Sequence, residues 1–189
     1  NYIKRGLVLK MILSQEKYYF KKNQIKNEHI VNTVVKETVK LSNKQETVVK
    51  KLSKICKSNQ YTTTLLDGVP GSGKTEIYFE IVREKIEENN QVLIMFPEVS
   101  LSNEFVIRLE KRFGLKPEVW HSKIPPSQKK MSLDRIIKGE SKIVIGARSS
   151  LFLPFPRLGL IIIDEEHDTS FKQEEQGIYH ARDMSVVRA

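Results

Sequence analysis

Eight consecutive residues, from Gly68 to Thr75, have the composition and spacing of a loop that binds phosphate. They read Gly68-Val69-Pro70-Gly71-Ser72-Gly73-Lys74-Thr75 and match the pattern G-x-x-x-x-G-K-[ST] in full. Glycines let backbone N–H groups converge on phosphates, and the start of a following helix adds the positive end of its dipole. We expect Lys74 to reach the β and γ phosphates and Thr75 to ligate magnesium. The pattern predicts a site for a nucleoside triphosphate and Mg²⁺.

A second group of chemical side chains follows an apolar run near the end of the chain. Residues 161–163 are all isoleucine, and Asp164-Glu165-Glu166-His167 come directly after them. We expect Asp164 to hold Mg²⁺, through water, and Glu165 to orient and activate an attacking water. The alternative is a solvated acidic turn with no chemical role. An acid directly after the magnesium aspartate favours hydrolysis, and so an ATPase over a small-molecule kinase.

The elements that would position these residues alternate regularly along the chain. Apolar runs of strand length alternate with segments of helical periodicity. Strands are predicted at 63–66, 92–96, 118–120, 142–145 and 160–163, and helices at 43–57, 74–88, 102–113 and 127–138. Largely apolar strands between helices call for a parallel sheet covered on both faces. We predict an α/β fold of the P-loop NTPase (RecA-like) kind.

The first 40 residues differ from the rest. They are rich in lysine and asparagine, with an apolar stretch at 7–13 and a β-branched run at 31–39, and they suggest strands or a connector. We assign 1–40 to an N-terminal extension or linker and 41–189 to the nucleotide-binding lobe. Because the first residue is Asn1 and not Met, we expect the sequence to be a piece of a longer protein.

Composition limits the compartment and the partners. Of 189 residues, 39% are hydrophobic and 29% charged, and no apolar run approaches the roughly 20 residues of a membrane helix. The single cysteine, Cys56, forms no intrachain disulfide and is expected to pack in a core, so we predict a reducing cytoplasm. The formal net charge of +9 fits a nucleic-acid partner. The alternative is a general preference for lysine, since many basic residues form no stripe.

His167 completes an Asp-Glu-x-His motif, which together with the phosphate loop resembles the DExH branch of superfamily 2 helicases and translocases. Further blocks in the same order resemble the PriA family of replication restart helicases, also called primosomal protein N′. These blocks lie at 41–45, 68–76, 96–101, 121–122, 145–152, 164–173 and 179–183. The resemblance covers about residues 41 to 189 strongly and 5–13 more loosely.

The resemblance implies an ATP-dependent DNA helicase that moves 3′ to 5′ and recognises stalled or repaired replication forks. It implies single-stranded and forked DNA, primosome proteins and a replicative helicase loader as partners. Gln45 would contact adenine, and His167 would couple the triphosphate to the DNA-facing surface. The implied DNA contacts are Pro97, Glu98, Arg148, Ser149, Ser150, Phe171 and Lys172.

Other interpretations of these residues remain open. Gln45 fits a helix-surface amide, His167 a hydrogen-bonded structural histidine, and the two serines simple loop capping. The family's second lobe, with its arginine finger and zinc-binding cysteines, is not in this sequence, so we expect the piece alone to turn over ATP weakly if at all. Two other functions are a DNA translocase of another superfamily 2 kind, and a non-catalytic remnant of a split gene that binds nucleotide or DNA.

Overall fold

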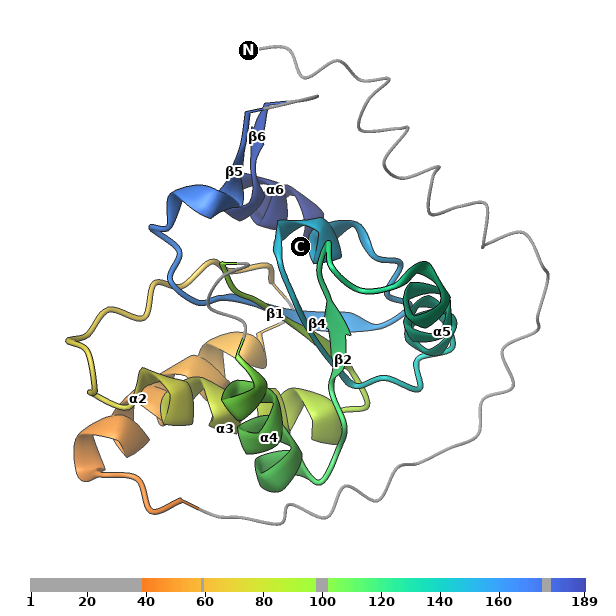
Figure 1. The fold of residues 1–189 in the computed structure, drawn as a ribbon. Coiled ribbons are helices and arrows are strands. Elements are labelled where there is room, and N and C mark those ends of the chain that lie inside the picture. Colours follow the sequence, from red (N-terminus) through yellow and green to blue (C-terminus); the bar gives the residue numbers. More distant parts are fainter. Residues whose placement is uncertain (1–38, 59, 98–101, 175–177) are drawn as a thin grey trace.

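The computed structural model describes residues 39–58, 60–97, 102–174 and 178–189. Within these residues, four parallel strands form a sheet in the order β2-β3-β1-β4 (Figure 1). The strands are β1 (Gln91–Met95), β2 (Glu118–Trp120), β3 (Ile143–Gly146) and β4 (Leu158–Ile163). Their register pairs Leu93 with Val144 on one side and with Ile161 on the other. The predicted extension at 1–38 lies outside the described residues.

Each long helix begins and ends where local signals place it. The helices are α2 (Asn43–Cys56), α3 (Lys74–Glu87), α4 (Asn103–Phe113), α5 (Pro126–Ile137) and α6 (Ala181–Arg188). Ser42 and Gln45 form a capping box at the start of α2. Ser102 caps α4, which ends at Gly114 with φ 65°, a left-handed conformation that glycine adopts without strain. The four predicted helices are confirmed to within a residue or two.

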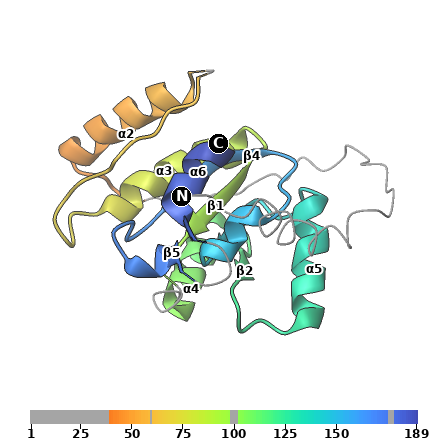
Figure 2. The same cartoon turned by 90° about the horizontal axis from the view of Figure 1, so that it is seen from above.

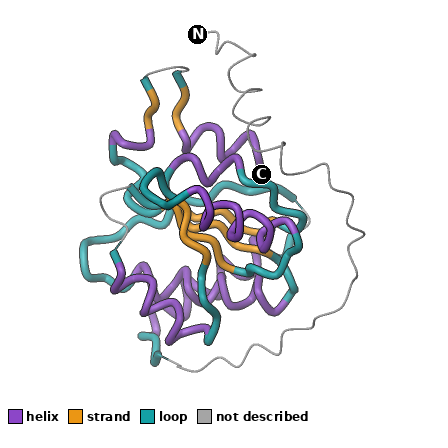
Figure 3. Tube along the Cα trace, turned by 45° about the vertical axis from the view of Figure 1, so that its right-hand side comes forward, coloured by secondary structure: helices purple, strands orange, loops and turns teal. Residues whose placement is uncertain are grey.

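Helices cover both faces of the sheet, as predicted. Alternate residues of β1 point to opposite sides, so Val92 and Ile94 join one core cluster while Leu93 and Met95 join the other. The first cluster packs α3 and α4 against the sheet, and the second packs α5, α6 and the 3₁₀ turn η2 (Arg148–Phe152). The strands lie between the two layers of helices in Figure 3, and Figure 2 shows the same fold seen from above. The α/β architecture with a parallel sheet is therefore confirmed.

The strand predicted at 63–66 is not formed. Residues 61–69 have no regular secondary structure, and Leu65 is 74% exposed. A strand needs a ladder partner and a face to bury, and this segment has neither among the described residues. Among the described residues, β4 pairs only with β1. No described strand lies along the other edge of β4. The strand propensity of residues 63–66 alone could not show that this segment lacks a strand to pair with.

The last part of the chain forms a small unit against the second core. A 3₁₀ turn, η3 (Thr169–Phe171), leads into the short antiparallel pair β5 (Lys172–Gln173) and β6 (Tyr179–His180), which stands above the sheet in Figure 1. Phe152 and Phe155 pack against the same cluster. Asp183 lies in the first turn of α6, where its negative charge interacts favourably with the positive end of the helix dipole.

Candidate nucleotide-binding site

The phosphate loop lies on the surface directly before α3. Gly71 and Gly73 have φ of 77° and 80°, values in the left-handed region that residues with a Cβ rarely adopt. Gly73 is also the N-cap of α3, so the unpaired N–H groups of the first helical turn open onto the loop. These features make the segment suited to bind an anion, as the sequence predicts.

Lys74 is held by its own loop. Its Nζ donates to the carbonyl oxygens of Gly68, over 2.5 Å, and Val69, over 3.3 Å. These acceptors are neutral, whereas a phosphate oxygen is charged and forms a stronger hydrogen bond with an ammonium group. A triphosphate could therefore draw Lys74 away from these carbonyls without any change in the fold.

Gln45 lies against the phosphate loop. Its Nε2 donates to the carbonyl oxygen of Ser72 over 3.1 Å, while its Oε1 accepts from the backbone N–H of Ser42 over 2.8 Å. A Cβ at Gly73 would collide with the amide of Gln45, so the glycine permits this close approach. The amide expected to contact a base thus borders the predicted site, and it also fixes the loop to α2.

The acidic turn follows the carboxyl end of β4. The backbone N–H of Asp164 donates to Met95 of β1 over 2.9 Å, which continues the sheet ladder to this residue. The next residue, Glu165, has φ 55°, a conformation that costs energy for a residue with a side chain and is concentrated at functional sites. The turn therefore presents Glu165 in an exposed position immediately beyond the sheet.

Tyr78 joins the phosphate-loop helix to the acidic turn. Its hydroxyl donates to Oδ2 of Asp164 over 3.0 Å, and Thr75 lies one helical turn earlier on the same helix. Burial, and secondly the charge of Asp164, raise the pKa of Tyr78 well above its usual range, so the hydroxyl stays protonated at neutral pH. The helix that carries one predicted Mg²⁺ ligand, Thr75, thus contacts the other, Asp164.

This donor set fits Mg²⁺ in the manner of a nucleotide site. Within the described residues, no group of three or more His, Cys, Asp or Glu side chains could hold a metal alone. Mg²⁺ needs fewer protein ligands than this, because it keeps several waters and binds one or two protein oxygens together with phosphates. The Thr75 hydroxyl and the Asp164 carboxylate supply such oxygens.

His167 and Glu166 extend the acidic turn in different directions. Nε2 of His167 lies 3.5 Å from Oε2 of Glu165, and its side chain is 77% exposed. Glu166 pairs with Arg182 of α6 over 3.0 Å, which connects the turn to the C-terminal unit. His167 therefore contacts the residue predicted to orient water, while Glu166 anchors the turn.

The residues expected to contact DNA fall into two groups. Arg148, Ser149 and Lys172 are at least partly exposed, and Arg148 donates to the carbonyl oxygens of Ser170, over 3.0 Å, and Lys172, over 2.7 Å. Lys172 pairs with Glu174 over 2.8 Å. Arg148 thus joins η2 to the segment that leads into β5.

The second group is buried or outside the described residues. Pro97 is buried, Phe171 is 1% exposed, and Ser150 is fully buried with its hydroxyl donating to Ala147 over 2.6 Å. The loop-capping interpretation therefore describes Ser150 in this structure, and Phe171 belongs to the second core. Glu98 lies outside the described residues. Side chains in these positions do not reach the surface, so Pro97, Ser150 and Phe171 are left out of any proposed DNA contact.

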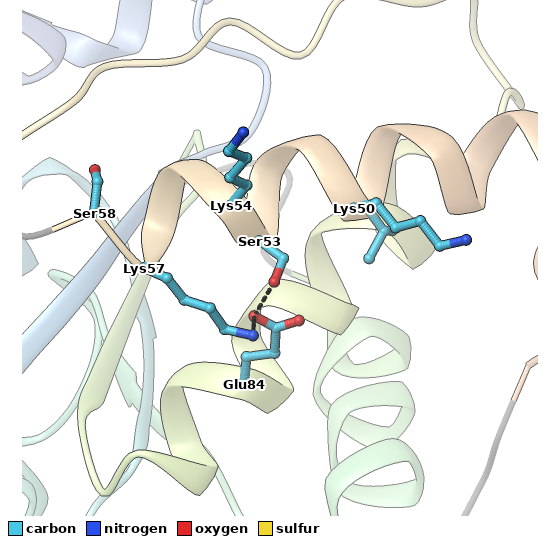
Figure 4. Close-up of a pocket in the computed structure, with 7 residues that line it drawn as sticks. Lys50, Ser53, Lys54, Lys57, Ser58 and Glu84 are labelled. Carbon is cyan, nitrogen blue, oxygen red and sulfur yellow. Dashed lines mark hydrogen bonds and ion pairs between the residues drawn. The ribbon is translucent and has the colours of Figure 1, made fainter.

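A shallow groove between α2 and α3 lies apart from the phosphate loop. Lysines border it, and its centre is Glu84, which accepts from Ser53 over 2.8 Å and lies 3.7 Å from Lys57. Figure 4 shows Lys57 turned toward Glu84 and Lys54 turned away from it. Cys56, close to this groove, is only partly buried, and α2 has no fully buried residue. The predicted core position of Cys56 is thus confirmed only in part.

Sequence reasoning missed Tyr78, which a simple signal could have found. It lies three residues after Thr75 on the predicted helix, a spacing that places both side chains on one face.

No helix in the described part of the chain is long and apolar enough to cross a membrane.

Comparison with known proteins identifies the family of this chain. The sequence profile of the DEAD/DEAH box helicases matches residues 42–188. The chain belongs to this family.

Its most informative relatives are named replication restart protein PriA. The protein of Rickettsia prowazekii (strain Madrid E) is 45% identical over 182 residues, 96% of this chain and 26% of that protein. That of Haemophilus influenzae is 42% identical, covering 86% and 22%, and that of Bacillus subtilis is 38% identical, covering 81% and 19%. The predicted resemblance to the PriA family is confirmed, and the chain spans about a quarter or less of the length of these relatives.

A solved structure, the C-terminal domain of a Sulfolobus solfataricus SWI2/SNF2 ATPase, aligns with 77% of this chain and 59% of that chain. The TM-score is 0.37 at 13% sequence identity, and no conclusion is drawn from so distant a likeness.

Proposed function

We propose that residues 41–189 are the first ATP-binding lobe of a replication restart helicase. The observation that carries this proposal is the hydrogen bond from Tyr78 of α3 to Asp164 over 3.0 Å, because it joins the helix that follows the phosphate loop to the acidic turn. Membership of a helicase family and similarity to replication restart proteins over most of the chain support the same conclusion.

Each side chain of the site has a role that its chemistry supports. Lys74 would offset the charge of the β and γ phosphates, and Thr75 and Asp164 would hold Mg²⁺. The ion would withdraw charge from the phosphate oxygens when bound. Glu165 would accept a proton from the attacking water. His167, which lies beside Glu165, would couple the bound triphosphate to the DNA-facing surface.

The whole protein would use hydrolysis to move 3′ to 5′ along DNA and to assemble a primosome at stalled or repaired forks. Arg148, Ser149 and Lys172 would contact the DNA backbone, because guanidinium, hydroxyl and ammonium groups are the usual partners of phosphate. The similarity to replication restart proteins supports the pathway. Primosome proteins and a loader of the replicative helicase are the partners proposed on the same ground.

Nucleotide binding is the first test. The purified chain is titrated into a fluorescent ATP analogue with Mg²⁺, alongside Lys74→Ala and the control Lys130→Ala, which removes an exposed lysine of α5 on the other face of the sheet. We expect the wild type and Lys130→Ala to bind alike and Lys74→Ala to bind at least ~10-fold more weakly, since hydrogen bonds to charged groups contribute about 1.5–3 kcal/mol. Equal binding by all three would refute the site.

Helicase activity is tested on the full-length gene product. We expect ATP hydrolysis to rise with single-stranded or forked DNA and to be lost in Glu165→Gln. Labelled partial duplexes with a 3′ or a 5′ tail report direction: unwinding only from the 3′ tail supports the proposal. DNA-stimulated hydrolysis without unwinding would indicate a translocase of another kind.

A further inference from the structure

Tyr78 is buried at the centre of the proposed site, where its hydroxyl has a specific partner. The side chain is 8% exposed, and its ring packs edge-on against Phe79 with the centroids 5.3 Å apart. Packing fixes the ring, so the position of the hydroxyl is set by the core and not by solvent. That hydroxyl donates to Asp164 over 3.0 Å.

Both carboxylate oxygens of Asp164 have donors. Oδ2 accepts from Tyr78, and Oδ1 accepts from the backbone N–H of Glu165 over 3.0 Å. The backbone of Asp164 is itself fixed by its hydrogen bond to Met95. A carboxylate held at both oxygens has one orientation, with its remaining lone pairs directed to a defined position.

Thr75 lies on the same helix as this tyrosine. It is in the first turn of α3, three residues before Tyr78. The hydrogen bond of Tyr78 therefore ties Asp164 to the helix that carries the other proposed Mg²⁺ ligand, although the two ligands are far apart in the chain.

We propose that Tyr78 is a positioning residue that orients Asp164 relative to Thr75 and so sets the Mg²⁺ affinity of the site. This inference rests on the proposed function. Groups that orient metal ligands in this way typically contribute 10- to 100-fold in metal affinity. A purely structural tyrosine would contribute to stability and leave the metal dependence unchanged.

The test is Tyr78→Phe, which keeps the ring and removes only the hydroxyl. Tyr179→Phe is the matched control, because Tyr179 is also buried and its hydroxyl has no hydrogen-bond partner in the described part of the chain. Binding of a fluorescent ATP analogue to the purified chain is measured at a fixed nucleotide concentration while Mg²⁺ is varied, and again in EDTA. Thermal unfolding confirms that each variant is folded.

We expect the half-saturating Mg²⁺ concentration to rise about 10-fold in Tyr78→Phe and to stay at the wild-type value in Tyr179→Phe, with binding in EDTA equal for all three. In an Asp164→Asn background, Tyr78→Phe should add no further shift, since the two residues act together. A shift of less than about twofold in folded Tyr78→Phe, or an equal shift in both backgrounds, would overturn the inference. Failure of the proposed function is a separate result, because the wild type itself would then show no Mg²⁺-dependent binding.

Discussion

The side-chain amide of Gln45 donates to the carbonyl oxygen of Ser72 over 3.1 Å, which fixes helix α2 to the phosphate loop. The oxygen and the nitrogen of this amide make separate contacts. Oε1 of Gln45 closes the capping box with Ser42, and Nε2 alone reaches the loop. A substitution can therefore remove the loop contact and keep the cap.

Gln45→Glu is that substitution, because glutamate caps a helix as glutamine does but has no N–H to donate. We expect binding of ATP and GTP analogues to weaken by a similar factor of about fivefold, which corresponds to one hydrogen bond of about 1 kcal/mol. Gln60→Glu, an exposed position, controls for the added charge. A loss confined to ATP would show that the amide contacts adenine instead.

Arg148 is expected to hold the segment between η3 and β5 in place. Its guanidinium donates to the carbonyl oxygens of Ser170 and Lys172, and Arg148→Ala removes both bonds. We expect backbone amides in residues 168–174 to exchange with deuterium several-fold faster in the variant, measured by mass spectrometry, because local opening becomes less costly.

Arg135→Ala is the control for this measurement. Arg135 pairs with Glu118 over 2.7 Å, so its loss removes an ion pair of another region. Unchanged exchange in residues 168–174 of Arg148→Ala, or an equal increase in both variants, would show that Arg148 does not hold the segment.

Gln91 is expected to contribute strongly to stability. It is fully buried in β1, and its Nε2 donates to the carbonyl oxygens of Ile136 and Ser141 over 3.0 and 2.9 Å. Gln91→Leu leaves both acceptors buried without this donor. We expect the free energy of unfolding in urea to fall by about 2–4 kcal/mol, whereas Gln60→Leu on the surface should change it by less than about 0.5 kcal/mol.

Cys56 is expected to react slowly with alkylating reagents. Burial, with smaller contributions from Glu84 and Glu88 and opposed by Lys85, raises the pKa of its thiol. Because the thiolate is the nucleophile, iodoacetamide at pH 8 should modify the folded chain several-fold more slowly than the chain unfolded in urea. The rate should approach its plateau at a higher pH in the folded chain.

The same shift has a consequence for stability. A raised pKa favours the protonated thiol in the folded state, so the contribution of Cys56 to stability is full below its unfolded pKa and is lost as pH rises through the folded value. Glu88→Gln removes a charge that raises the pKa, and it should speed alkylation of the folded chain. Equal alkylation rates for the wild type and Glu88→Gln would contradict this account. Identical pH profiles of alkylation for the folded and the unfolded chain would also contradict it.

Much of the fold follows from local signals in the sequence. The limits of α3 and α4 come from the glycine before Lys74, the Ser102 cap and the stop at Gly114, all of which act within a few residues. β4 is apolar throughout, and this composition predicted a strand covered by other elements. The phosphate loop and the acidic turn were equally visible, because each needs particular residue types at fixed spacing.

The relations between distant residues were not visible in the same way. Thr63 to Leu66 has the composition of a strand, yet pairing depends on a neighbour far away in the chain. Phe171 and Ser150 have residue types that suit DNA contact, and only the tertiary structure shows that they are buried. Periodicity cannot report which side of a loop faces the core.

The sequence by itself predicted the nucleotide chemistry, since Lys74, Thr75, Asp164 and Glu165 are recognisable from their immediate neighbours. Tertiary structure decided how these groups meet: Tyr78 joins Asp164 to α3, and Gln45 joins α2 to the loop. The physical reason is that residue type fixes which hydrogen bonds a side chain can make, whereas the packing of α3 against β4 and α2 brings particular donors within about 3 Å of particular acceptors.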